Sequence, residues 1–182
     1  SMDWNSSFDQ KQRNVDLLRI VEPKKFFSIC DLGCGNASLI RELDFYYCSS
    51  YVGIDLNRHV IAMNKYKYDG QKNIKFKVGN SPVKTDYCLA SGIFNVKKSI
   101  DHETWSAYVQ TIIYRMLKKS NLGFAFNILK PVSEGFFGKE HLYYAAEESV
   151  VESLMNMGIA RDRIELHRNV NYWETNYLVR LR

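Results

Sequence analysis

The sequence is short of every pattern that marks a non-globular protein. Its 182 residues include 3 prolines and 10 glycines, far below the ~25% of these residues that is typical of low-complexity chains. It holds no run near the ~18 consecutive apolar residues that a membrane span needs. Charge of one sign is in small excess, since 25 basic and 20 acidic residues leave +5. With 46% hydrophobic residues, the chain predicts one soluble globular domain over residues 1–182 and no membrane association.

Cysteine is scarce as well, and the few that occur are not spaced as a metal or disulfide site. Cys30, Cys34, Cys48 and Cys88 form no C-x-x-C pair, so the sequence predicts neither a disulfide framework nor a bound metal. The chain begins with acidic and amide residues rather than with the basic and then apolar residues of a signal peptide. We therefore expect a cytoplasmic protein, and the sequence leaves its oligomeric state open.

Strand-like and helix-like segments alternate along the whole chain. Short apolar or alternating runs predict strands, and longer segments with apolar residues at helical spacing predict helices. The alternation is typical of an α/β domain with a mostly parallel sheet, and the last two strands are close enough in sequence to form an antiparallel pair. The expected strands are 26–32, 51–55, 73–78, 87–91, 122–129, 163–167 and 175–181, and the expected helices are 6–21, 37–43, 58–68, 103–118 and 145–157.

The most informative segment lies where the first expected strand meets the helix after it. From Asp31 to Gly35 it reads D-L-G-C-G, and its glycines allow a tight turn and a close approach of the backbone to a ligand. Open α/β sheets bind their ligands beyond the carboxyl ends of the strands. Asp55 ends the second expected strand, 20 residues after Gly35, and a carboxylate there can accept hydrogen bonds from both hydroxyls of a ribose. The pattern predicts a cofactor that contains adenosine.

Two adenosine cofactors fit this geometry, a nicotinamide dinucleotide and S-adenosylmethionine. The dinucleotide fingerprint continues with a third glycine or alanine, where this chain has Ser38. Asp31 would repel a pyrophosphate, whereas it would attract the ammonium and sulfonium groups at the amino-acid end of S-adenosylmethionine. These two residues favour S-adenosylmethionine, and a nicotinamide oxidoreductase is an alternative.

The same segments resemble the class I S-adenosylmethionine-dependent methyltransferases over most of the chain. Residues 31–35 resemble the first motif of that family, residues 51–56 the second, and residues 86–95 the region of its fourth strand. The resemblance implies a Rossmann-like three-layer α/β/α fold with a seven-stranded, mostly parallel sheet whose last strand is antiparallel. It also implies S-adenosyl-L-methionine as the cofactor and S-adenosyl-L-homocysteine (SAH) as the product.

Three further segments resemble, more narrowly, a bacterial methyltransferase group associated with surface-polysaccharide or modified-sugar pathways. They are residues 90–95, 124–127 and 142–145. In that group an N-terminal helical arm, here residues 1–22 with Trp4 and Arg13, would cover and bind the cofactor. Two departures are visible, because Ala37 replaces the third glycine of the first motif and residues 168–173 differ from the group's acidic, proline-containing pattern.

The resemblance implies a role for each motif residue. Asp31 would face the amino group of the cofactor, directly or through water, and Gly33 and Gly35 would let the backbone pass close to its methionine end. Asp55 would hold the ribose. The other expected contacts are with the adenine, through Leu56, Asn80 and Pro82, and with the space where donor and acceptor meet, through Ser91 and Gly92.

A base is needed if the acceptor must lose a proton, and the loops after the fourth and fifth strands hold three candidates. His102 is flanked by Asp101 and Glu103, so that a carboxylate could orient its ring, although the same residues could simply cap a helix. His141 and Tyr143 lie in the later loop. We predict these three as catalytic or acceptor-binding residues, and the alternative for each is a structural role.

The acceptor and the partners are the least determined part of the prediction. Five lysines cluster between residues 65 and 77, and basic clusters bind phosphates. The segment shows no aromatic stacking platform and the net charge is modest, so a solvated helix face is favoured over nucleic-acid binding. We expect the acceptor to be a hydroxyl of a small molecule or sugar-type metabolite, which could be anionic. The alternatives are an RNA or protein methyltransferase and a non-catalytic S-adenosylmethionine-binding module.

Overall fold

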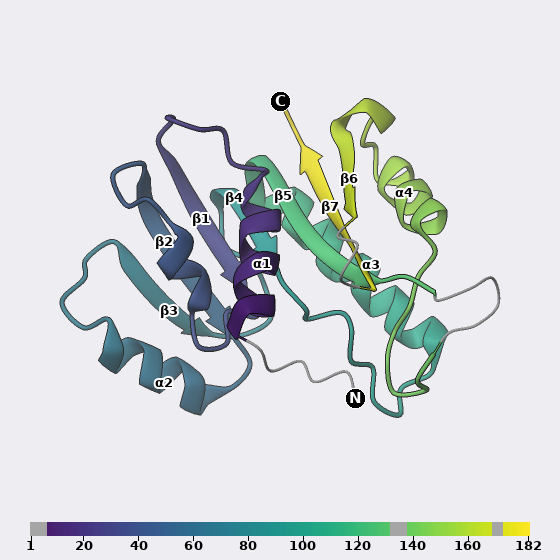
Figure 1. The fold of residues 1–182 in the computed structure, drawn as a ribbon, viewed down its shortest axis with the longest axis horizontal. Helices are drawn as coiled ribbons and strands as arrows, with labels where there is room; N and C mark the ends of the chain where they lie inside the picture. The colour runs from purple at the N-terminus through teal and green to yellow at the C-terminus, as the bar shows by residue number, and fades with distance from the viewer. Residues whose placement is uncertain (1–6, 132–137, 169–172) are drawn as a thin grey trace.

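A computed structural model describes residues 7–131, 138–168 and 173–182 (Figure 1). Its seven strands form one sheet in the order β3-β2-β1-β4-β5-β7-β6. β7 is antiparallel to both of its neighbours, and the pairs among β1 to β5 are parallel, which confirms the expected fold class. The strands are β1 (Phe27–Leu32), β2 (Cys48–Asp55), β3 (Ile74–Val78), β4 (Thr85–Ala90), β5 (Ser120–Leu129), β6 (Ile164–Arg168) and β7 (Glu174–Arg180).

Helices cover both faces of the sheet (Figure 1). One apolar core includes Leu17, Ile40 and Ile61 from α1, η1 and α2, and the other includes Met116 and Leu154 from α3 and α4. None of the helices in the described part of the chain is long and apolar enough to cross a membrane. The helices are α1 (Ser7–Leu18), the 3-10 helix η1 (Ser38–Glu42), α2 (Arg58–Lys67), α3 (His102–Lys119), α4 (Glu147–Asn156) and the 3-10 helix η2 (Arg161–Arg163).

Two elements differ from the sequence prediction. The sequence predicts a helix over residues 37–43, but Ala37 has a left-handed backbone with φ of 57°, so the chain turns there before the short 3-10 helix η1. β2 begins at Cys48 rather than at residue 51, because Cys48 pairs with Phe27 of β1. For β2 the pairing with β1, rather than local propensity, determines the boundary.

The parallel strands bring three loops to one edge of the sheet. Asp31 of β1 pairs with Gly53 of β2 and with Leu89 of β4. The chain therefore leaves the carboxyl ends of β1, β2 and β4 side by side. The glycine motif follows β1, Leu56 follows β2 and Ser91 follows β4, so this edge collects the residues that the sequence assigns to a cofactor.

Candidate functional site

The loop after β1 has a conformation that its glycines make possible. Gly33 and Gly35 have φ of +76° and +48°, in the left-handed region that glycine adopts at no steric cost. The backbone N–H groups of Gly33 and Cys34 both donate to the carbonyl of Ile54 in β2, at 2.7 and 3.0 Å. A Cβ atom on Gly33 would lie 2.0 Å from Cγ2 of Ile93. Gly33 is therefore required both by its dihedral angle and by the close packing of Ile93.

Gly35 is held from both sides by side chains of other elements. Its N–H donates to Oδ2 of Asp55 at 3.0 Å, and its carbonyl accepts a hydrogen bond from Nδ2 of Asn64 at 2.7 Å. The second oxygen of Asp55 accepts the N–H of Asn57 at 2.8 Å. Asn64 was not among the residues expected at the site. The sequence does hold a sign of this role, because Asn64 follows Ile61 by three residues and so places a polar amide on the buried face of α2.

Two adjoining hollows open at this edge of the sheet, and both are lined by Gly33 and Ile93. We call them the larger hollow, with a volume of about 460 Å³, and the smaller hollow, with a volume of about 210 Å³; pockets of a few hundred Å³ suit small-molecule ligands. The larger hollow is also lined by Gln10, Arg13, Cys34, Gly35, Asn36, Ser91, Gly92 and Val96. The smaller hollow is also lined by Leu32, Asp55, Leu56, Gly79, Asn80, Trp105, Tyr108 and Ile112.

The structure brings together most of the residues that the sequence assigns to the cofactor. Arg13, Gly33, Gly35 and Ser91 line the larger hollow, and Asp55, Leu56 and Asn80 line the smaller one, together with Gly33. Trp4 lies outside the described residues. Each hollow has one charged side chain among its described lining residues, the Arg13 guanidinium in the larger and the Asp55 carboxylate in the smaller.

Asp31 is placed differently from the expectation that it faces the cofactor's amino group. It is buried, 5% exposed, and lines neither hollow. Its Oδ2 accepts the hydroxyl of Tyr51 at 2.7 Å, which turns the carboxylate into the interior. Burial raises the pKa of Asp31 to about 6, the Tyr51 hydrogen bond works against this rise, and the nearby Asp55 adds to it. The Asp31 side chain thus faces the interior in this structure, and its contact with the cofactor stays a prediction.

We expect Asp31→Asn to change how stability depends on pH. Because the folded protein binds this proton more tightly than the unfolded chain does, the contribution to stability is present below about pH 4 and is lost as the pH rises through about 6. The change of pKa from 3.8 to about 6 corresponds to about 3 kcal/mol. The stability of the variant relative to the unsubstituted protein should therefore increase by about that amount across this range, measured by urea unfolding.

Asp86→Asn is the matched control. Burial works to raise the pKa of Asp86, but hydrogen bonds from Asn121 and Ser28 outweigh it, so that the pKa lies below its usual value. The charge of Asp86 therefore contributes stability above the pKa of the unfolded chain, and this contribution is lost as the pH falls. The relative stability of this variant should change with pH in the opposite direction. A pH-independent difference for Asp31→Asn would contradict the burial argument.

The three residues predicted as catalytic do not line either hollow. His102 is the first residue of α3, its Nε2 lies 3.1 Å from the carbonyl of Tyr144, and its ring lies 5.0 Å from that of Tyr143. His141 is exposed, and its carbonyl accepts the N–H groups of Lys97 and Lys98.

Tyr143 is buried beside a different cavity. Its hydroxyl donates to Oγ of Ser106 at 3.2 Å, and it lines a hollow of about 70 Å³ between α3 and α4. Asp101 caps α3 by accepting the N–H of Thr104 at 2.8 Å. Helix capping is the alternative that the sequence analysis gives for the residues around His102. His102 and Tyr143 thus make packing and hydrogen-bond contacts, and the catalytic roles of His102, His141 and Tyr143 stay predictions.

One wall of the smaller hollow comes from α3, which the sequence analysis did not include in the site. Trp105, Tyr108 and Ile112 lie on one face of this helix and line the hollow. The indole N–H of Trp105 donates to the carbonyl of Phe94 at 2.8 Å, and its ring lies 5.1 Å from that of Tyr108. The spacing of these residues is that of one helix face, a signal that was present in the sequence but compatible with an ordinary core.

The comparisons with known proteins agree with this geometry. The chain is 36% identical over 131 residues to Rv1506c of Mycobacterium tuberculosis, which is named as a methyltransferase, and the match covers 70% of this chain and 78% of the relative. No protein-family model matches the chain.

Solved structures share the fold. Magnesium protoporphyrin IX methyltransferase from Synechocystis PCC 6803, with bound SAH, has a TM-score of 0.67 at 14% identity, and the match covers 99% of this chain and 90% of that chain. The N-methyltransferase NodS from Bradyrhizobium japonicum WM9 has a TM-score of 0.63 at 14% identity, with 94% and 95% covered. At these identities the structural matches establish the fold alone.

Proposed function

Since the chain belongs to the class I S-adenosylmethionine-dependent methyltransferases, we propose that it transfers the methyl group to a hydroxyl of a small molecule or sugar-type metabolite. Family membership sets aside the nicotinamide oxidoreductase. The residues that line the two hollows bear on the choice of acceptor.

The charged groups of the hollows fit S-adenosylmethionine. Asp55 in the smaller hollow suits the two ribose hydroxyls, and Arg13 in the larger hollow suits the carboxylate at the methionine end, since charge-assisted hydrogen bonds are among the strongest available. Leu56 offers an apolar face to the adenine, and the amide of Asn80 can pair with its edge. The proposed cofactor site therefore rests on one acidic and one basic side chain that line two adjoining hollows.

When bound, the cofactor supplies a methyl group on a positively charged sulfur, which a nucleophile can displace. The protein's own contribution is to hold donor and acceptor in line, and positioning supplies much of the acceleration in such a displacement. Gly35 is fixed by Asp55 and Asn64, so the loop that passes the methionine end is rigid before the cofactor arrives. Trp105 and Tyr108, which line the smaller hollow, would shield the nucleoside end of the bound cofactor from water.

The larger hollow suits a small polar acceptor. Its polar side chains are Gln10, Arg13, Asn36 and Ser91, and among the described residues the Oγ of Ser91 is buried without a hydrogen-bond partner. A hydroxyl or a second polar group of an acceptor would satisfy that atom. The five lysines between residues 65 and 77 are exposed and line neither hollow, which supports a small acceptor over a nucleic acid.

Two measurements test the proposed function. Calorimetric titration with SAH should show micromolar binding, on the order of −8 kcal/mol. Incubation of a cell extract with the protein and S-adenosylmethionine that is radiolabelled in its methyl group should then place the label in the low-molecular-weight fraction, with the extract alone as the control. Label in RNA or protein would identify a macromolecular acceptor instead. Binding of SAH with no transfer in any extract would indicate a non-catalytic module.

A further inference from the structure

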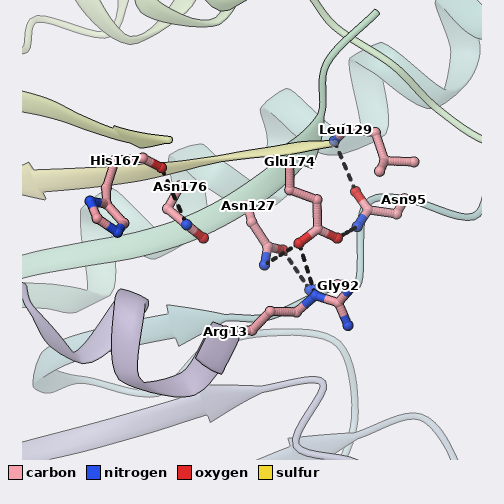
Figure 2. A network of polar contacts seen from close by, with 8 residues as sticks. All are labelled: Arg13, Gly92, Asn95, Asn127, Leu129, His167, Glu174 and Asn176. Atoms are coloured by element: carbon pink, nitrogen blue, oxygen red, sulfur yellow. Dashed lines mark hydrogen bonds and ion pairs between the residues drawn. The ribbon is translucent and has the colours of Figure 1, made fainter. Parts of the chain in front are cut away.

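A buried carboxylate lies behind the larger hollow, at the start of β7 (Figure 2). Glu174 is 3% exposed. Its Oε2 accepts a hydrogen bond from Nε of Arg13 at 2.9 Å and one from Nδ2 of Asn127 at 3.4 Å, and its Oε1 accepts Nδ2 of Asn95 at 2.8 Å. Three donors from α1, β5 and the segment after β4 therefore converge on one side chain of β7.

The two asparagines carry these contacts to the backbone. Oδ1 of Asn127 accepts the N–H of Gly92 at 2.7 Å, and Oδ1 of Asn95 accepts the N–H of Leu129 at 3.3 Å. Each amide is thus engaged at both its oxygen and its nitrogen, so neither can rotate without losing two hydrogen bonds. Gly92 lines the larger hollow. The Glu174 carboxylate is therefore linked to this wall of the hollow through the Asn127 side chain alone.

Arg13 forms the opposite end of the same network. Arg13 lines the larger hollow, and its Nε–H donates to Glu174. Because the guanidinium is planar, a hydrogen bond at Nε determines the direction in which the rest of the group points. Figure 2 shows Arg13 and Gly92 meeting at the Glu174 and Asn127 side chains. Two walls of the hollow, one from α1 and one from the loop after β4, are therefore held by one carboxylate.

Such a network is costly to bury. Burial raises the pKa of Glu174, and the charge of Arg13 and the hydrogen bonds from Arg13 and Asn95 act against that rise. Buried ion pairs contribute little net stability on average, and their best-supported use is to specify one arrangement. The arrangement specified here is the relative position of two parts of a ligand site.

We propose that Glu174 is a positioning residue for S-adenosylmethionine, which orients Arg13 toward the carboxylate of the cofactor and holds the Gly92 wall through Asn127. This inference rests on the proposed function. Glu174 does not touch the cofactor and acts through Arg13 and Asn127. It was outside the residues expected from the sequence, since it lies 161 positions from Arg13.

Glu174→Gln is the direct test, because it keeps the shape of the side chain and replaces one acceptor oxygen by an N–H₂ donor. That donor must face a group that also donates, so either the Arg13 contact or an asparagine contact is lost. We expect the affinity for SAH, measured by calorimetric titration, to fall about tenfold. Arg13→Met should cause a similar loss. In the double variant the two losses should be less than additive, since Glu174 acts on the cofactor partly through Arg13 and partly through Asn127.

Glu147→Gln is the matched control. Glu147 pairs with Arg168 and accepts the hydroxyl of Thr175, which is the next residue of β7 after Glu174, but it lines neither hollow. It should leave the affinity for SAH unchanged, while thermal unfolding records the stability of every variant. An equal loss of affinity in Glu147→Gln would show that β7 stability alone matters and would overturn the proposal. Additive losses in the double variant would also overturn it.

A milder variant covers the case in which Glu174→Gln does not fold. Arg13→Lys keeps the positive charge but lacks the Nε–H that Glu174 orients, and we expect about a tenfold loss of SAH affinity. Unchanged affinity would overturn the inference. Failure of the unsubstituted protein to bind SAH would instead contradict the proposed function, so the two ideas can fail separately.

Discussion

Replacing Asp55 by alanine is expected to weaken the binding of SAH by about 100-fold or more. In the proposed complex the carboxylate accepts the two ribose hydroxyls, and hydrogen bonds to a charged group contribute about 1.5–3 kcal/mol each. A loss of about 3 kcal/mol already corresponds to about 100-fold in affinity. The variant also frees the N–H of Gly35, which donates to Asp55 at 3.0 Å. Calorimetric titration with SAH measures the effect.

Two further variants separate the roles of Asp55. Asn64→Ala removes the second clamp on Gly35, the 2.7 Å hydrogen bond to its carbonyl, without removing a side chain that lines either hollow. It should cost less affinity than Asp55→Ala. Asp69→Ala, an exposed acid after α2, should leave affinity unchanged. Equal losses in the Asp55 and Asn64 variants would show that Asp55 acts on the loop and has no direct contact with the ribose.

Alanine at Gly33 and alanine at Gly35 should damage the protein in different ways. At Gly33 the new methyl group would lie 2.0 Å from Ile93 at a φ of +76°, so the loop or the segment after β4 must move. Overpacking costs about 1–3 kcal/mol and a left-handed alanine about 1–2 kcal/mol. We therefore expect Gly33→Ala to lose about 2–5 kcal/mol of unfolding free energy, measured by urea denaturation, together with binding of SAH.

Gly35→Ala is the matched partner of that variant. A Cβ atom there meets no protein atom within 4 Å, so its cost to stability should be limited to about 1–2 kcal/mol of backbone strain. Because Gly35 lines the larger hollow, the methyl group would occupy space that the cofactor needs, and SAH affinity should fall by at least about tenfold.

Relief of the Gly33 clash provides the corresponding control. Adding Ile93→Ala to Gly33→Ala removes the side chain that the new methyl group meets, and part of the lost stability should return. A Gly33→Ala variant as stable as the unsubstituted protein would contradict the packing argument. A Gly35→Ala variant with undiminished affinity for SAH would show that the cofactor does not approach this part of the loop.

Two boundaries of the fold differ from the sequence prediction, one at a backbone turn and one at a contact between strands. The strand, glycine loop and helix order was predictable from residues 27–42, but Ala37 turns into the left-handed region and leaves only a short 3-10 helix. β2 begins as early as Cys48 because Cys48 pairs with Phe27 of β1. The mostly parallel sheet was predictable from the alternation of strands and helices, since parallel strands need crossover connections, whereas the order of the strands came from the structure.

The residues of the candidate site also fall into two groups, those that local sequence predicts and those whose side-chain direction depends on a distant residue. Gly33, Gly35 and Asp55 were predictable because a turn residue and the end of a strand are local features, and parallel strands bring such ends to one edge. The expected contact of Asp31 with the cofactor stays a prediction, because the sequence does not say whether this carboxylate points toward the site or into the interior. Only the Tyr51 hydroxyl, 20 residues away and 2.7 Å distant, turns it inward.

The sequence by itself therefore determined the fold class, the edge of the sheet that carries the site and the cofactor that suits it, since these depend on the order of elements and on residues near one another in the chain. The tertiary structure decided which side chains form the walls. Trp105 and Tyr108 enter from α3, and Glu174 meets Arg13 across 161 positions. Such pairings arise when distant elements pack on one sheet, and a buried carboxylate is satisfied only by the donors that packing brings to it.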